Sequence, residues 1–316
     1  MIDDLPMFRK MPDQGALITN IDGGSYAHPN EALQEPSILA PKKRRLFQKI
    51  PRAKTSMSDT PTDIDEAADL IVEGYERNAF FPIALQGRLS FDEALRLQIA
   101  VLNRRLERGD ELAGWKIGLT SPSVRKRFGS DRQPFGYLLH QGLIPSGSEI
   151  DLDDIVVGAG IEPELCFVMG ADLEGPGITP EQTRGAVAGV APGMEINQRR
   201  DGGVLDFALS VADNLTQWAV VHGETIPLPA EFLSDDLVVR MERNGGLEAS
   251  MVGRDVIDDH FSSIATLANI LGEYGLALKS GQRLITGSFS KHDPARGDRW
   301  RASFDGIGSC EVAFRR

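Results

Sequence analysis

Two glutamates, Glu162 and Glu164, lie two residues apart within the otherwise apolar segment 160–168. In an extended strand the side chains alternate between two faces, so both carboxylates would point the same way. Adjacent like charges repel each other, and a bound divalent cation would supply the opposite charge that both need. The spacing therefore predicts a metal site. A solvent-facing strand at the edge of a sheet, which would suit Pro163, also fits the spacing alone.

The composition is typical of a globular protein with a large core. Of 316 residues, 41% are hydrophobic and 25% are charged. No apolar run approaches the roughly 20 residues that span a bilayer, and no secretory signal is evident. Cys166 and Cys310 each lie in an expected strand, which is typical of reduced, buried cysteines. Because the formal charge is −12, nonspecific nucleic-acid binding is not expected. These features favour a cytoplasmic protein without a membrane or nucleic-acid partner.

Residues 1–56 differ from the rest of the chain. They carry scattered Pro and Gly, no sustained periodicity and a basic cluster at 42–45. We expect either a flexible extension whose basic cluster contacts something acidic, or a segment upstream of a true start at Met57. Residues 57–316 are expected to form a single catalytic domain.

The remainder alternates between helical and strand patterns. Ser90 and Glu93 match a capping box at a helix start, and Thr179 followed by Pro180 marks another. Many hairpin signals and few β-α-β units favour an α+β fold with a mixed, mainly antiparallel β-sheet or barrel-like core and peripheral helices. Helices are expected at 58–78, from 90, from 179 and near 255–274, and strands at 115–119, within 152–169, in a hairpin at 237–251, and at 282–289 and 299–315.

Several segments resemble the 2-hydroxypenta-2,4-dienoate hydratase and 4-oxalocrotonate decarboxylase family of the fumarylacetoacetate hydrolase superfamily. The segment 114–121, Gly-Trp-Lys-Ile-Gly-Leu-Thr-Ser, is similar to the family motif G-x-K-[IV]-G-L-T-S. The resemblance implies a fold of the fumarylacetoacetate hydrolase type, dependence on Mg²⁺ or Mn²⁺, and 2-oxo acid substrates from aromatic catabolism. Further matches follow in family order over about residues 62–315, at 135–138, in the Glu-Pro-Glu strand, and at 190–196, 211–214, 280–288 and 306–309.

The resemblance makes Glu162, Glu164 and Glu195 the three metal ligands. Three carboxylates without a neighbouring His or Cys describe a site of hard oxygen ligands, which suits Mg²⁺ or Mn²⁺ better than Zn²⁺. The remaining coordination positions would hold water, or the carboxylate and 2-oxo oxygens of a 2-oxo acid.

Lys116 is the expected catalytic residue. It stands between Trp115 and Ile117 in a short apolar segment, where a lysine is expected to be either paired or functional. Near three carboxylates its ammonium would stay charged, and it could stabilise a developing enolate or carry a proton. A purely structural ion pair is the alternative.

The resemblance also implies polar residues around the substrate. Thr120 and Ser121 would lend hydroxyl or backbone N–H groups to the substrate carboxylate, although a simple turn fits them equally well. Asn214, Thr216 and Ser288 fall at the other polar positions of the family.

Some family positions differ in this chain. The family usually has an acidic residue before its Phe-Gly pair, where it is thought to help water addition or proton transfer, whereas Pro134 stands here. Leu209 replaces a common aspartate, and residues 258–262 replace the family run Gly-His-Pro-Leu-Asn. These differences leave the exact substrate and reaction open.

The expected reaction is the addition of water at C4 of a 2-oxo-enoic acid, formed from a 2-hydroxydienoate, to give a 4-hydroxy-2-oxo acid. Decarboxylation of the 4-oxalocrotonate type is the first alternative, and a non-catalytic partner of an active homologue is the second. Hydrolytic C–C cleavage ranks lower, because no His–Glu pair is evident. Members of the family form homo-oligomers, and hydratase and decarboxylase can associate, so we expect a homo-oligomer or such a hetero-complex.

Overall fold

The computed structural model describes residues 63–120, 125, 132–155, 158–200, 206–232 and 234–316. These residues belong to one unit of the chain, Asp59–Arg316. The predictions for residues 1–56 and for Ser121 therefore lie outside the described residues.

The larger of two sheets in this part of the chain has the strand order β2-β1-β11-β5-β6-β7-β3, with β8 paired to β6. The β1–β11 and β3–β7 pairs are parallel and the other neighbours are antiparallel, as the mainly antiparallel prediction requires. Its strands are β1 (Leu112–Ile117), β2 (Phe135–Leu139), β3 (Leu143–Pro145), β5 (Gly160–Met169), β6 (Val187–Asn197), β7 (Gln217–His222), β8 (Ile226–Pro227) and β11 (Arg283–Ser288).

The smaller sheet has the order β10-β9-β12-β13-β4. The predicted hairpin is its β9–β10 pair, which turns at Asn244 and Gly245, both with positive φ. Its strands are β4 (Ser148–Ile150), β9 (Val238–Arg243), β10 (Gly246–Val252), β12 (Arg299–Phe304) and β13 (Gly308–Phe314).

Helices begin where the capping patterns predict, with one exception. Ser90 and Thr179 each form a capping box. The exception is the helix expected near 255–274: it is present as α7 but begins later than expected, because Asp259 accepts hydrogen bonds from two backbone N–H groups and caps it after the extended Ile257. The helices are α1 (Ile64–Glu76), α2 (Phe91–Glu107), α4 (Pro180–Ala186), α5 (Phe207–Ala212), α6 (Gly253–Val256) and α7 (His260–Glu273), with 3₁₀ turns η1 (Ile83–Leu85), η2 (His140–Gly142), η3 (Leu152–Asp154) and η4 (Asn214–Thr216).

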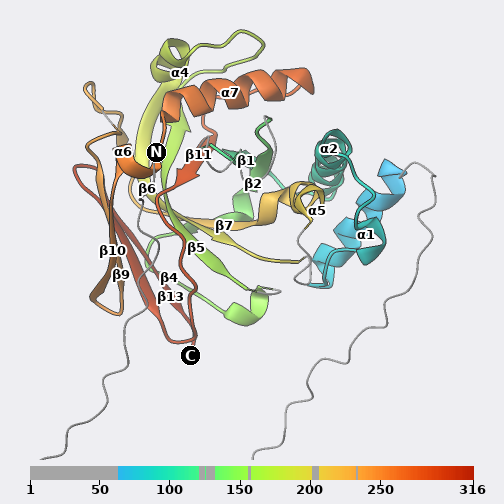
Figure 1. The fold of residues 1–316 in the computed structure, drawn as a ribbon, viewed down its shortest axis with the longest axis horizontal. Helices are drawn as coiled ribbons and strands as arrows, with labels where there is room; N and C mark the ends of the chain where they lie inside the picture. Colours follow the sequence, from blue (N-terminus) through green and yellow to red (C-terminus); the bar gives the residue numbers. More distant parts are fainter. Residues whose placement is uncertain (1–62, 121–124, 126–131, 156–157, 201–205, 233) are drawn as a thin grey trace, which may run out of the picture. The chain divides into compact units, whose positions relative to one another are not determined.

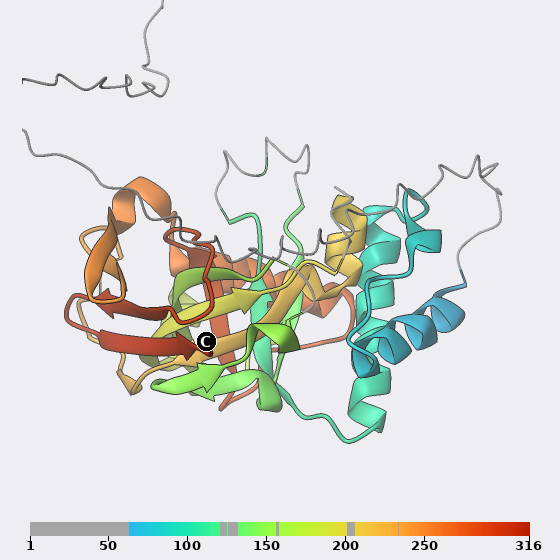
Figure 2. The same cartoon turned by 90° about the horizontal axis from the view of Figure 1, so that it is seen from below.

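Three helices and the smaller sheet flank the larger sheet on different sides. Helices α1, α2 and α5 lie together on one side (Figures 1 and 2), and β9 and β10 lie on the opposite side (Figure 1). Large buried side chains such as Trp115, Phe167 and Trp300 belong to the hydrophobic core, and Phe167 lies against Phe261 of α7. Burial of these apolar side chains is the main stabilising contribution, at roughly 25 cal/mol per Å².

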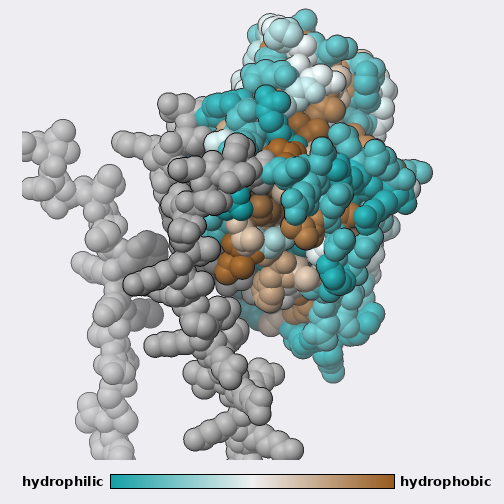
Figure 3. Space-filling view, turned by 90° about the vertical axis from the view of Figure 1, so that its right-hand side faces the viewer, coloured by the Kyte–Doolittle hydropathy of each residue, from teal (hydrophilic) through white to brown (hydrophobic). Residues whose placement is uncertain are grey.

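The face that carries α1 and α2 in Figure 1 is largely hydrophilic with separate apolar areas (Figure 3). Among the large apolar side chains, Leu70 of α1, Phe80 and Ile83 of η1 are exposed. None of the helices in the described residues combines the length and apolar character needed to cross a membrane.

Candidate metal centre

The pairing of β5 with β6 brings the three predicted ligands together. Glu162 lies directly opposite Glu195 in the antiparallel register, and Glu164 lies opposite Gly193. Because side chains alternate along a strand, all three carboxylates project from one face of the larger sheet. One carboxylate oxygen from each lies within 4.8 Å of the others, which is close enough for a single cation to bridge them.

The alternative of a solvent-facing edge strand is wrong, because β5 lies between β11 and β6 and Glu164 is buried. Pro163 fits this interior position because β11 ends at Ser288, and Phe289, just beyond the end of β11, donates to the Pro163 carbonyl oxygen. The β11–β5 register shifts between Ile285 and Ser288, as in a β-bulge, and prolines within sheets are found at such bulges. The bulge also turns the Gly287 N–H inward, where it donates to Glu164 Oε2 at 2.9 Å.

Lys116 reaches the same cluster from β1. Its buried ammonium donates to Glu195 Oε1 and, at 3.3 Å, to the carbonyl oxygen of Leu215. Burial opposes the charged form, but the charges of Glu195 and Glu164 outweigh it, so the pKa of Lys116 is raised. Lys116 is therefore a cation at neutral pH and is held against one of the predicted ligands.

Burial and mutual repulsion disfavour the ionised forms of two of the carboxylates. Burial, followed by the charge of Glu195, raises the pKa of Glu164 well above its usual value. Burial also raises the pKa of Glu195, although Lys116 opposes the shift. The three carboxylates face a single buried ammonium, so their negative charge is only partly balanced. A hard divalent cation prefers carboxylate oxygens and would balance the remainder, so the residues present fit a divalent metal.

The predicted substrate-binding residues have different surroundings. A side chain at Gly287 would clash with Thr120 Oγ1, so the Thr120 hydroxyl lies against the bulge that supports Glu164. Ser288 lies opposite Glu164 in the register, and its hydroxyl donates to the Ser290 carbonyl oxygen at 2.6 Å.

The other two predicted residues, Asn214 and Thr216, lie in the turn η4, which has an unusual backbone conformation. Asn214, Leu215 and Thr216 all have positive φ (54°, 50° and 61°), which non-glycine residues adopt only at a cost. The side-chain amide of Asn214 bonds both backbone groups of Tyr137, at 2.7 and 2.9 Å. The backbone carbonyl of Thr216 accepts a hydrogen bond from Gln198 N. The turn thereby presents the Leu215 carbonyl to Lys116.

Two relatives of known activity match most of this chain. The TodF product hydratase of Pseudomonas putida strain F1 is 30% identical over 257 residues, which are 80% of this chain and 96% of that protein. The 4-oxalocrotonate decarboxylase of Pseudomonas sp. strain CF600 is 30% identical over 228 residues, 72% and 86% of the two chains. The chain belongs to the 2-hydroxypentadienoate hydratase and 4-oxalocrotonate decarboxylase family. No protein-family profile matches the chain.

A solved structure of the hydratase and decarboxylase family has the same fold. The 4-oxalocrotonate decarboxylase of Pseudomonas putida G7, complexed with magnesium and adipate, superposes with a TM-score of 0.74 at 26% identity and covers 79% of this chain and 97% of its own. The predicted family and the predicted fold are both confirmed.

Two residues at the centre are not among the predicted ones. Asn197 Nδ2 and Lys291 Nζ each donate to Glu162 Oε1 at 2.8 Å. Asn197 follows Glu195 by two residues on β6, so the period-two argument used for Glu162 and Glu164 could have found it. Lys291 lies in the connection after β11, and the sequence carried no signal for its approach. In this member of the hydratase and decarboxylase family, both side chains hold Glu162 from the outside of the cluster.

A second buried charge cluster lies on the other side of η4. Arg200 Nη1 donates to Asp213 Oδ1 at 2.9 Å, and the Tyr75 hydroxyl donates to the same oxygen at 2.8 Å. The Arg200 guanidinium also lies 3.8 Å from the centre of the Tyr75 ring. Both charged groups are almost fully buried. This cluster contains one positive and one negative charge.

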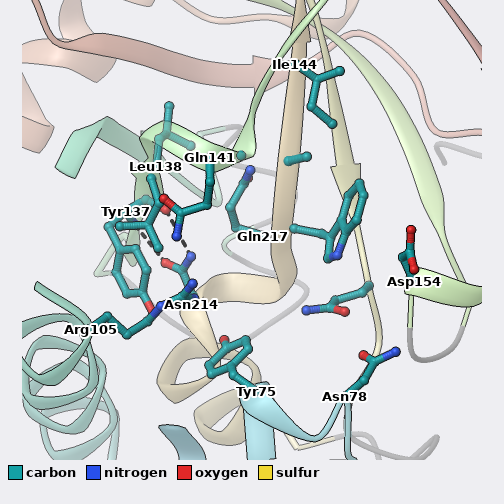
Figure 4. Close-up of a pocket in the computed structure, with 15 residues that line it drawn as sticks. Tyr75, Asn78, Arg105, Tyr137, Leu138, Gln141, Ile144, Asp154, Asn214 and Gln217 are labelled. Carbon is teal, nitrogen blue, oxygen red and sulfur yellow. Dashed lines mark hydrogen bonds between the residues drawn. The ribbon is translucent and has the colours of Figure 1, made fainter. Parts of the chain in front are cut away.

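The larger described cavity, of about 400 Å³, is separate from the three carboxylates. It opens between β2 and β7, and Tyr137, Gln217 and Arg105 line it (Figure 4). Among the predicted substrate-binding residues that the structure describes, Asn214 alone lines it, with its amide turned toward Tyr137. The carboxylates and Lys116 do not line this cavity, so the candidate chemistry lies elsewhere on the sheet.

Proposed function

We propose that this protein is a divalent-metal-dependent hydratase. It converts a 2-hydroxydienoate, through its 2-oxo-enoic tautomer, into a 4-hydroxy-2-oxo acid. The observation that carries the proposal is the gathering of Glu162, Glu164 and Glu195 beside the buried ammonium of Lys116. Relatives named as hydratases of 2-hydroxydienoates support the choice of reaction, among them a 2-hydroxyhexa-2,4-dienoate hydratase of Comamonas testosteroni, 29% identical over 229 residues.

Mg²⁺ or Mn²⁺ is the proposed cofactor, held by Glu162, Glu164 and Glu195. Magnesium in the decarboxylase of similar fold and 26% identity supports this assignment. When bound, the metal supplies Lewis acidity for the charge that develops on the 2-oxo oxygen of the substrate. Because all the ligands are carboxylates, a softer metal such as Zn²⁺ is disfavoured.

Lys116 is the proposed catalytic residue. Its ammonium is buried, charged and bonded to Glu195, so it can stabilise an enolate oxygen and hand over a proton without first being protonated by solvent. The Leu215 carbonyl fixes its direction through the second hydrogen bond. A positioned group of this kind contributes about 10²- to 10⁴-fold to a proton-transfer step.

Thr120, Ser121, Asn214, Thr216 and Ser288 remain proposed substrate-binding residues. Thr120 has the strongest support, because its hydroxyl lies against Gly287, which itself donates to Glu164. Asn214 has weaker support, because both ends of its amide already bond Tyr137.

Decarboxylation is the second candidate reaction. It is favoured by the 30% identity to the decarboxylase of strain CF600, and by Pro134, which stands where the family usually carries an acid that aids water addition. Pro134 is buried, and its carbonyl oxygen accepts from the backbone N–H of Gly118. A proline there can neither donate nor accept a proton, so water addition would have to rely on Lys116. The same substitution is the best support for a non-catalytic partner role.

The test is an assay of the purified protein with Mg²⁺ or Mn²⁺ on a panel of 2-hydroxydienoates and 2-oxo-3-enedioates, following the dienol absorbance and CO₂ release. We expect loss of the dienol band without CO₂. Glu162→Gln and Lys116→Met should each abolish most turnover, whereas Lys279→Met, an exposed lysine paired with Asp172, should not. CO₂ release would favour the decarboxylase. No turnover on any member of the panel, despite metal binding, would favour the partner role.

The protein is further proposed to form homo-oligomers or to associate with a homologous decarboxylase or hydratase. The exposed apolar side chains of Leu70, Phe80 and Ile83 support an interface at α1 and η1. Light scattering with size-exclusion chromatography tests this, and Ile83→Asp should shift the molecule toward the monomer if the face is used.

A further inference from the structure

His260, the first residue of α7, is a buried polar side chain that the proposed chemistry does not use. It is 1% exposed, and its ring lies against Phe167 and Phe289, with centroids 5.2 and 6.2 Å apart. Nδ1 lies 2.7 Å from Thr286 Oγ1, while Nε2 has no hydrogen-bond partner within the described part of the chain. A buried nitrogen without a hydrogen-bond partner is destabilising. Stability alone would therefore favour apolar side chains at both partners of this hydrogen bond.

The partner of His260 belongs to the bulge that supports the metal centre. Thr286 is 1% exposed and immediately precedes Gly287, whose N–H donates to Glu164. A bulge interrupts the ladder of backbone hydrogen bonds, so its geometry depends on other anchors. Thr120 packs against Gly287 on one side, and the hydrogen bond between Thr286 and His260 anchors the preceding residue.

We propose that His260 is a positioning residue for the metal centre: through Thr286 it fixes the β11 bulge, and the bulge aims the Gly287 N–H at Glu164. The inference rests on the proposed metal site. His260 acts as a neutral hydrogen-bonding group, neither a ligand nor a proton donor, because its Nδ1 is turned to Thr286 and aromatic rings surround it. The chain retains the imidazole at a cost in stability because it fixes the orientation of one ligand.

Mn²⁺ affinity, measured by isothermal titration calorimetry, tests the proposal in a double-mutant cycle. His260→Phe keeps a ring among the neighbouring rings, and Thr286→Val keeps the branched shape, so each removes one partner of the bond. Each single variant is expected to bind Mn²⁺ about 10-fold more weakly. The double variant should be no weaker than either single one, since both remove the same bond. Thr286→Ser keeps the hydroxyl and should bind as the parent does.

Two further readouts separate positioning from a structural role. The metal-free double variant, His260→Phe with Thr286→Val, should be as stable as the parent or more stable, because it removes the unpaired nitrogen and leaves no buried hydroxyl without its partner. Hydrogen exchange of the Gly287 amide, measured without metal, should be faster in both His260→Phe and Thr286→Val.

Three results would overturn the proposal, and they are distinguishable. Equal Mn²⁺ affinity of parent and variants refutes the positioning role and leaves the metal site intact. A parent that binds no Mn²⁺ refutes the metal site and this inference together. If His260→Phe fails to fold, stability and not positioning explains the histidine, and parental affinity of Thr286→Val then completes the refutation.

Discussion

The two buried charge clusters on either side of η4 differ in their balance. In the cluster of Arg200, Asp213 and Tyr75, one cation faces one anion. In the other, three carboxylates face Lys116 and, at the rim, the largely exposed Lys291. The first cluster is therefore balanced in charge. The second is one positive charge short, which a cation at the proposed site would supply.

Glu164→Gln should have the largest effect, because it removes a ligand from the unbalanced cluster. Substitutions behind a metal ligand typically cost about 10- to 100-fold in affinity, so loss of the ligand itself should weaken Mn²⁺ binding by more than about 100-fold and abolish turnover. Metal-free stability should not fall, since a buried like charge is removed. Calorimetry and urea denaturation measure the two effects, with the exposed Glu174→Gln as control. Parental Mn²⁺ affinity would contradict the ligand assignment.

Asp213→Asn should lower the stability of the protein and leave its Mn²⁺ affinity unchanged, the opposite of what we expect for Glu164→Gln. It leaves the buried guanidinium of Arg200 without its counter-charge, so the free energy of unfolding should fall by about 3–5 kcal/mol. Mn²⁺ affinity of the folded fraction should stay near the parental value. Urea denaturation and calorimetry again provide the measurements. A loss of Mn²⁺ binding with unchanged stability would reverse the roles we assign to the clusters.

The pH dependence of stability should also distinguish the clusters. Burial, and then the charge of Glu195, raise the pKa of Glu164, so the native state keeps a proton that the unfolded chain has released. The protonated Glu164 carboxyl stabilises the native state fully below the usual carboxyl pKa. This stabilisation is lost as the pH rises through the raised pKa of Glu164. Metal-free protein should therefore lose stability as the pH rises above the usual carboxyl range. Thermal unfolding of Glu164→Gln should show a smaller loss over the same rise in pH, and an equal loss would argue against the shift.

Lys291→Met should have the smallest effect. The side chain is 58% exposed, and exposed ion pairs contribute only about 0–1 kcal/mol to stability. Removing its charge makes the cluster more negative, so Mn²⁺ should bind slightly more tightly while KM for an anionic substrate rises. Raising the salt concentration should shrink both differences. Lys291→Arg, which keeps the charge, should resemble the parent.

The sequence predicted the parts of the site that depend on local geometry. The two-residue spacing of Glu162 and Glu164 was enough to place both on one face of a strand, and the capping residues Ser90 and Thr179 marked helix starts correctly. The helix expected near 255–274 exists but begins at His260, because Asp259 caps it there, and the apolar periodicity alone did not mark that start.

What the sequence could not predict depends on pairing between distant segments. The bulge in β11 exists only relative to β5, so the Gly287 contact with Glu164 could not be read from Gly287 alone. Similarly, Asn214 was expected at the substrate, yet its amide bonds Tyr137, which is 77 residues away. Neither contact has a local pattern, because each requires the tertiary fold to bring the segments together.

The position of Asn214 has a consequence for how the chain avoids self-association through its strands. Among the described strands of the larger sheet, β2 stands at one end, where unpaired backbone groups would otherwise template the addition of a foreign strand. Asn214 occupies both backbone groups of Tyr137, and the Gln98 side chain occupies the Phe135 carbonyl. Two amide side chains thus cap the open edge in place of a neighbouring strand. Loss of either amide would leave backbone groups of this buried edge strand without a hydrogen-bond partner.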